Sequence, residues 1–142
     1  MTTIGKAFAE DHRRLEAELS GASSLIEAED WPAAAARFVR FREGIERHIE
    51  VEEQVLFPAV ENGAEIPLTA ILRKGHRDLK VFFDEVEDAI LDRDQSEALR
   101  IISAMCALLE RHDKKEEAEL YPVAQERLGT AGAASISEAL HG

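Results

Sequence analysis

Residues 48–58 read HIEVEEQVLFP, and residues 112–122 read HDKKEEAELYP. Both stretches follow the pattern His-x-x-x-Glu-Glu-x-x-Leu, and an aromatic residue and a proline complete each one. Side chains four residues apart lie on the same face of an α-helix, so each stretch presents a histidine and a glutamate one turn apart. The two copies are separated by 64 positions, and the same offset relates DHRRL from Asp11 to GHRDL from Gly75. The sequence therefore predicts two copies of one helical unit.

Apolar residues recur at intervals of three and four along nearly the whole chain, which is typical of amphipathic helices. We expect four inward-facing stripes: Phe8, His12, Leu15, Leu19, Ala22 and Ile26; Phe38, Phe41, Ile45, His48, Glu52 and Val55; Leu68, Leu72, His76, Leu79, Phe83, Val86 and Ile90; Ile102, Met105, Leu109, His112, Glu116 and Leu120. Four such helices of similar length predict an all-α protein. The expected architecture is an antiparallel up-down-up-down four-helix bundle, in which a helical hairpin is repeated about a pseudo-twofold axis.

Residues with strong positional preferences mark the expected boundaries. Asp30 and Asp94 are predicted N-caps, Asn62–Gly63 a turn, and Gly129 the end of the fourth helix. We therefore expect residues 1–128 to form the bundle. Residues 129–142 are expected to form a C-terminal segment, either a short docked helix or a frayed tail.

Four histidines, one in each helix, are expected to lie at the same level. His12 lies 18 residues before Asp30 and His48 lies 18 residues after it. At 1.5 Å per residue, each is therefore about 27 Å from the first hairpin turn. His76 and His112 are placed in the same way around Asp94. Glu52 and Glu116 each lie one turn after a histidine, on helices that are expected to run in the same direction. Both carboxylates are therefore expected on the same side of the histidine layer.

This polar layer predicts a metal centre. Two buried carboxylates without partners are costly, and bound metal ions would stabilise them. Imidazole and carboxylate ligands suit iron, manganese or zinc, and six ligands suit two ions bridged by two carboxylates. The predicted ligands are His12, His48, Glu52, His76, His112 and Glu116. The alternatives are histidines that are merely structural, and a metal-free solvated channel or proton relay.

The repeated motif, with a further histidine 36 residues before each copy, resembles the hemerythrin family in its HHE cation-binding form over residues 1 to about 128. The resemblance implies a four-helix bundle that holds two iron ions in an oxo- or hydroxo-bridged non-haem centre, with manganese or zinc as alternatives. It also implies that the four histidines are terminal ligands and that Glu52 and Glu116 bridge the two ions.

The chain departs from the oxygen-carrying hemerythrins at one ligand. Those proteins have a fifth histidine one turn before the third-helix ligand, where this chain has Leu72. Many of them also place the last carboxylate ligand five residues after its histidine, and this spacing would make Glu117 the ligand. The internal repeat instead favours Glu116, because it corresponds to Glu52. In the oxygen carriers, one iron has a full set of ligands and the other has an open position. The resemblance therefore implies that the loss of one nitrogen ligand leaves both irons of this chain unsaturated. We therefore expect redox reaction, iron handling or sensing in place of simple oxygen carriage.

Composition excludes several classes of function. The formal net charge of −12 makes nucleic acid and anionic membranes poor partners. No apolar run is long enough to span a membrane, the first residues lack a signal-peptide pattern, and the single cysteine excludes a disulfide framework. These features predict a cytoplasmic protein. Cys106, in an apolar stretch, is expected to be a small core residue.

The expected function is that of a non-haem di-iron protein that binds O2 or a related small oxidant, such as peroxide or NO, for sensing, storage or detoxification. One alternative is a di-iron enzyme with catalase-like or NO-reducing activity, so the sequence leaves open whether the protein is an enzyme. Another is a helical interaction module with a structural metal. The expected partners are a small diatomic or peroxide ligand and, for sensing, an unidentified protein. Six apolar residues are expected to close the site to all but small molecules: Leu15, Leu19, Phe41, Ile45, Phe83 and Leu109.

Overall fold

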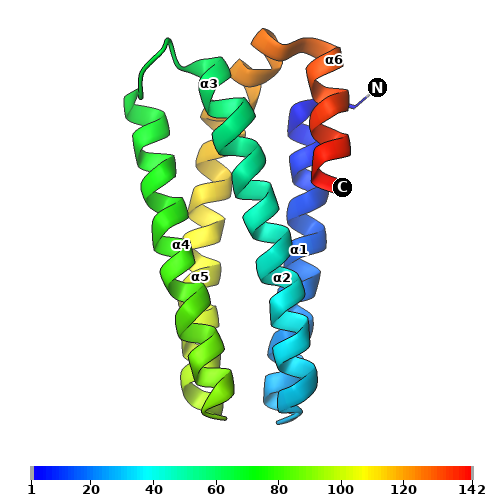
Figure 1. The fold of residues 1–142 in the computed structure, drawn as a ribbon, viewed down its shortest axis with the longest axis vertical. Helices are drawn as coiled ribbons and strands as arrows, with labels where there is room; N and C mark the ends of the chain where they lie inside the picture. Colours follow the sequence, from blue (N-terminus) through cyan, green and yellow to red (C-terminus); the bar gives the residue numbers. More distant parts are fainter. Residues whose placement is uncertain (1, 142) are drawn as a thin grey trace.

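The computed structural model describes residues 2–141, and its long helical segments form a four-helix bundle (Figure 1). The elements are α1 (Ile4–Glu27), α2 (Trp31–Val51), the π-helical turn η1 (Glu52–Leu56), α3 (Phe57–Val60), α4 (Pro67–Leu91), α5 (Gln95–Lys115), the π-helical turn η2 (Glu116–Leu120) and α6 (Tyr121–His141). None of the described residues forms a strand. The predicted all-α fold class is therefore confirmed.

The two hairpin turns have the same backbone conformation. Asp30 caps α2 by accepting from the Ala33 N–H, and Asp94 caps α5 by accepting from the Glu97 N–H. The residue before each cap, Glu29 or Arg93, has a positive φ of 57° or 55°. The two predicted N-caps are therefore confirmed, and the turns that contain them are related by the same 64-residue offset as the sequence motifs.

A π-helical turn begins at each of the two predicted glutamate ligands. The N–H of Phe57 donates to the carbonyl of Glu52, and the N–H of Tyr121 donates to that of Glu116, five residues earlier in both cases. The wider turn adds a residue to the helical repeat and changes which side chains face inward. Val55, which was expected on the inward stripe, is therefore 39% exposed.

The core consists of two apolar clusters on either side of the polar layer. The larger lies toward the two hairpin turns and includes Leu15, Phe41, Leu79 and Met105. The smaller lies at the opposite end of the bundle. Its members are Ile4, Ala7, Phe8, Val51, Leu56, Phe57, Val60, Leu72, Leu120, Tyr121, Ala124, Ala133, Ile136 and Leu140. The predicted ligands lie between these clusters, where apolar packing restricts the access of water.

The end of α6 belongs to the smaller cluster. Gly129 has φ 66° and ψ −166°, so the helix bends there, and its last part runs back beside α1 (Figure 1). Ala133, Ile136 and Leu140 are buried in the same cluster as Phe8. Residues 130–141 are thus a docked helix, whereas Gly142 lies outside the described residues. No helix in the described part of the chain is long and apolar enough to cross a membrane.

Candidate metal centre

The structure brings all six predicted ligand side chains together in the interior of the bundle. Each is buried, although they come from α1, α2, η1, α4, α5 and η2. The Nε2 atoms of His12 and His48 are 3.0 Å apart, and His76 Nε2 is 3.1 Å from a Glu52 carboxylate oxygen. The expected convergence of histidines from four helices is therefore seen.

The donor atoms form two groups, and within each group they lie within 4.8 Å of one another. One group contains Glu52, His76, His112 and Glu116, and the other contains His12, His48 and Glu116. Glu116 belongs to both groups. A carboxylate has two oxygens, so this residue has the right placement to bridge two ions.

Buried polar atoms at the centre of these groups lack hydrogen-bond partners. Among the described residues, His112 Nε2 and Glu116 Oε2 are buried and without such a partner, although they are 3.3 Å apart. A void of about 10 Å³ lies between the ligand side chains of both groups. Unsatisfied buried polar atoms are costly, and imidazole nitrogen and carboxylate oxygen are common metal donors. The residues present therefore fit a bound metal.

Two carboxylates orient histidines of the site by contacting the Nδ1 atom of the ring. Asp11 Oδ2 lies 2.7 Å from His48 Nδ1, and Glu53 Oε2 lies 2.6 Å from His76 Nδ1. A carboxylate that accepts from Nδ1–H leaves Nε2 free to coordinate and fixes the orientation of the ring. The sequence-based prediction missed Asp11. Asp11 could have been recognised because its position lies on the buried stripe of α1, three residues after Phe8.

The hydroxyl of Tyr121 connects the two central carboxylates. It donates to Glu52 Oε2 at 2.9 Å and to Glu116 Oε1 at 3.2 Å, and all three side chains are buried. The Tyr121 ring stacks on Phe8 with a centroid separation of 4.8 Å. Sequence reasoning did not assign this residue to the site, because an aromatic side chain before a proline is typical of a core position at a helix end.

The four histidines differ in the direction in which their surroundings shift the pKa. Burial alone would lower the pKa of His48, but the charge of Glu52 and the hydrogen bond with Asp11 raise it to about 9. The pKa of His76 is also raised, against the effect of burial, by its bonds with Glu52 and Glu53. Burial lowers the pKa of His12 to about 3 and that of His112 to about 4. His12 and His112 are thus neutral at pH 7, the form that binds metals.

The pKa values of the two central glutamates are shifted in opposite directions. Burial and the nearby charge of Glu52 raise the pKa of Glu116 well above its usual value. The pKa of Glu52 is lowered in spite of burial, by its hydrogen bond with Glu116 and by the charge of His48. His48, with its pKa raised to about 9, is protonated at pH 7, so a metal held by this histidine would have to displace its proton.

The structure also separates the two adjacent glutamates of the second motif. Glu116 is buried in the site, whereas Glu117 is exposed. Leu72, at the position of the fifth histidine of oxygen carriers, is fully buried in the smaller apolar cluster. The geometry therefore favours Glu116 as the ligand.

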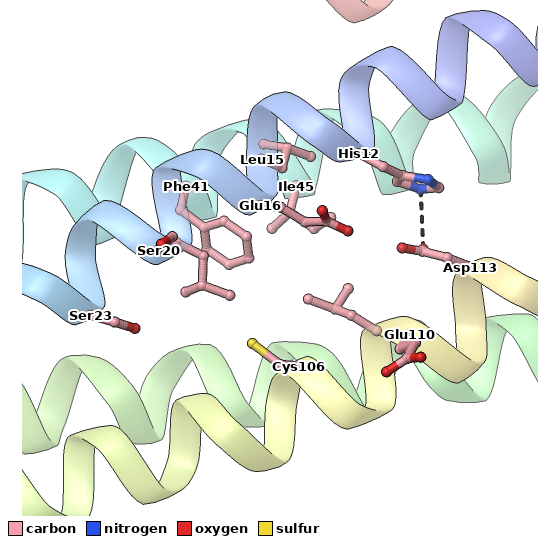
Figure 2. A pocket seen from close by; sticks show the side chains of 12 residues that line it. His12, Leu15, Glu16, Ser20, Ser23, Phe41, Ile45, Cys106, Glu110 and Asp113 are labelled. Carbon is pink, nitrogen blue, oxygen red and sulfur yellow. Dashed lines mark ion pairs between the residues drawn. The ribbon is translucent and has the colours of Figure 1, made fainter.

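A cavity of about 580 Å³ lies between α1 and α5 and reaches the edge of the site, and we call it the α1–α5 cavity (Figure 2). Its lining includes His12 and Asp113 at one end and Cys106 on the α5 side. Asp113 Oδ1 is 3.1 Å from His12 Nε2, and burial raises the pKa of this aspartate to about 7. Two expectations are wrong here. The apolar layers leave one edge of the site open at His12, and Cys106 is exposed on the face of α5 that borders the cavity.

Comparison with known proteins agrees with this geometry. The family model described as hemerythrin HHE cation binding domain matches residues 3–124 of the 142-residue chain. No curated protein and no solved structure matches the chain. The match covers the bundle and all six predicted ligands. The chain therefore belongs to the hemerythrin HHE cation-binding domain family.

Proposed function

We propose that this protein is a non-haem di-iron protein that binds O2 or a related small oxidant, such as peroxide or NO, for sensing, storage or detoxification. The observation that carries the proposal is the pair of buried donor groups that share Glu116. Imidazole and carboxylate donors in this ratio suit iron, and manganese and zinc are the alternative metals. Family membership supports a metal cofactor at the same residues.

The proposed ligand assignment follows the two groups. His12 and His48 would hold one ion, and His76 and His112 would hold the other. Glu52 and Glu116 would bridge them, because Glu116 belongs to both groups and the two Glu52 oxygens lie 3.5 Å from His48 Nε2 and 3.1 Å from His76 Nε2. When bound, two iron ions would supply electron transfer and open coordination positions for a small ligand.

The chain's own residues prepare this site. Asp11 and Glu53 hold the Nδ1 protons of His48 and His76, so that the Nε2 atoms face the centre. Tyr121 holds its hydroxyl proton between the carboxylates of Glu52 and Glu116 and keeps them in position. The apolar clusters on both sides limit the water that reaches these groups.

The proposal includes an up-down-up-down bundle built from a duplicated hairpin, with a pseudo-twofold axis between the halves. The matching turns at Glu29–Asp30 and Arg93–Asp94 support this symmetry. A duplicated hairpin would provide two similar half-sites for a pair of metal ions.

Catalase-like or NO-reducing turnover is the second candidate function. Two observations favour it: Leu72 supplies no nitrogen ligand, and Tyr121 and Asp113 place groups that can carry protons at the site. A cytoplasmic location is part of the proposal and is supported by the single cysteine of the chain.

The first experiment measures metal content per chain by elemental mass spectrometry, on protein expressed with ample iron and purified without a metal-affinity tag. We expect about two irons per chain, as two bridged ions require. Absorption spectra recorded during exposure to and removal of O2, peroxide and NO would then distinguish reversible binding from turnover. One zinc per chain, or no metal, would contradict the di-iron proposal and favour a structural role.

A further inference from the structure

We propose that the α1–α5 cavity binds an elongated apolar organic molecule with a neutral or positively charged polar end, and that this end lies beside His12 and Asp113. The binding itself requires no metal. Only the consequence, that the polar end meets the metal centre, rests on the proposed function.

The size of the cavity suits an organic molecule. Its volume of about 580 Å³ falls within the range of about 300–1,000 Å³ that is usual for small-molecule sites. A diatomic ligand needs only a small part of this space, since one water molecule occupies about 30 Å³ in the liquid. Access for O2 alone therefore does not account for the cavity.

The walls of the cavity are apolar along its length. Leu15, Leu19, Phe41 and Ile45 line it from α1 and α2, and each is at most 4% exposed. Figure 2 shows Cys106 on the opposite side, on α5. Burial and the nearby charge of Glu16 raise the pKa of the Cys106 thiol, so it is uncharged at neutral pH. An alkyl chain or aromatic ring that packs over these side chains would bury its own apolar surface.

The polar groups of the lining determine the preferred charge of the ligand. Glu16, Glu110 and Asp113 are acidic, and no lysine or arginine of the described residues lines the cavity. The remaining polar lining residues are Ser20, Ser23 and His12. The lining therefore offers a carboxylate or phosphate no lysine or arginine with which to pair. An alcohol or an amine can instead donate hydrogen bonds to the acidic side chains.

The same surface disfavours a protein partner as the occupant. The large apolar side chains that are exposed in the described chain lie outside the cavity: Val39, Val55, Ile71, Val81 and Leu91. The rim therefore lacks the apolar ring that would be expected around a protein-docking groove.

The test uses three probes with the same alkyl chain, namely octan-1-ol, octylammonium and octanoate, below their micellar concentrations. Cys106 is the only cysteine, so iodoacetamide modifies one site in the cavity wall. We expect octanol and octylammonium to slow this modification saturably and to give matching calorimetric isotherms. Octanoate should require at least about tenfold higher concentrations, because its charge lies near the acidic side chains of Glu16 and Glu110.

Matched variants locate the binding site. Ser20→Trp places a ring in the cavity and should abolish the calorimetric signal of octanol, whereas Ser24→Trp, on the same helix outside the lining, should leave it unchanged. The double variant Glu16→Gln/Glu110→Gln should bring octanoate binding closer to that of octanol. A lack of saturable octanol and octylammonium binding, equal binding of octanoate, or full octanol binding to Ser20→Trp would overturn the proposal.

Parallel measurements on metal-free and iron-loaded protein separate this proposal from the di-iron function. Octanol binding to a chain that takes up no metal would support the cavity proposal while the di-iron proposal failed. Two bound irons without octanol binding would do the opposite.

Discussion

The two halves of the bundle contribute the same donor side chains but differ in what supports them. In the first half, Asp11 accepts a hydrogen bond from His48 Nδ1 at 2.7 Å. The corresponding position in the second half is Gly75, where a Cβ atom would lie only 2.6 Å from His112 Nδ1. His112 thus packs against bare backbone where His48 has a carboxylate. The charge of Glu52 and the hydrogen bond with Asp11 raise the pKa of His48 against the effect of burial, whereas burial lowers the pKa of His112.

The other pair of histidines shows the converse difference. Glu53 lies 2.6 Å from His76 Nδ1, but its counterpart Glu117 is exposed, and His12 Nδ1 is a buried atom without a hydrogen-bond partner among the described residues. Each proposed ion would therefore meet one histidine anchored by a carboxylate and one that is not.

At two further positions, only the second half places a polar side chain in contact with the predicted ligands. Tyr121 contacts both central carboxylates, whereas its counterpart Phe57 stacks on His76 with a centroid separation of 5.6 Å. Asp113 lies beside His12, whereas its counterpart Ile49 is an apolar core residue. The two copies of the sequence motif therefore share their donor side chains, while the groups that contact these donors differ.

The largest expected effect comes from removing the shared donors. Glu52→Gln and Glu116→Gln should each lower the metal content from about two ions to less than about one per chain, since a bridge serves both ions. The matched control is Glu117→Gln, which changes an exposed residue. Elemental analysis of the three variants checks this prediction. Equal metal content in all three would contradict the ligand assignment.

Loss of a supporting carboxylate should have a smaller effect. Asp11→Asn and Glu53→Gln should each weaken metal binding by about 10–100-fold, because the second nitrogen of the ligand loses its charged acceptor. Competition with a chelator of known affinity measures the change. Asp11 is 2% exposed at its side chain and Glu53 is 33% exposed, so the Asp11 variant should lose more. The reverse order would show that burial does not control the strength of this support.

The pH dependence of metal binding tests the effect of Asp11 on His48. His48 has its pKa raised to about 9, so below that pH a proton must leave before the metal binds. Affinity should therefore rise between pH 7 and 9 by about tenfold per unit for each proton displaced. Chelator competition across this range checks the slope. In Asp11→Asn the pKa of His48 should fall and the slope should decrease, whereas an unchanged slope would assign the proton to another group.

Tyr121→Phe makes the second half resemble the first at this position. It should lower the free energy of unfolding of the metal-free protein by about 1–3 kcal/mol, because two buried carboxylates lose a donor. Urea unfolding at neutral pH measures this difference. The substitution removes only the hydroxyl, and it leaves Pro122 and the preceding π-helical turn unchanged. A stability equal to that of the parent protein would mean that the carboxylates do not depend on this hydroxyl.

The smallest expected effect concerns Gly75. Alanine commonly stabilises a helix by up to about 1 kcal/mol relative to glycine. Gly5→Ala should show such a gain, since nothing lies within 4 Å of the added Cβ. Gly75→Ala should not, because its Cβ would displace the His112 ring. Thermal unfolding of both metal-free variants tests the difference, and an equal gain would show that the ring moves without cost.

Much of the fold was predictable because helical geometry is local. The spacing of apolar residues located the helices, and Asp30 and Asp94 marked two of their starts. The rise per residue then placed the four histidines at one level. The π-helical turns were not predicted, because a helix with one additional residue in a turn leaves no clear mark in a short apolar pattern. Val55 was consequently placed on the wrong face.

The sequence by itself determined the helical class, the internal repeat and the six side chains that meet in the core. These follow from spacing within each helix and from the repeated motif. Only the tertiary structure decided that Asp11 reaches His48, that Tyr121 contacts both glutamates, and that a cavity separates α1 from α5. Those features depend on how far apart neighbouring helices lie and how each is rotated, and no single helix carries that information in its own periodicity.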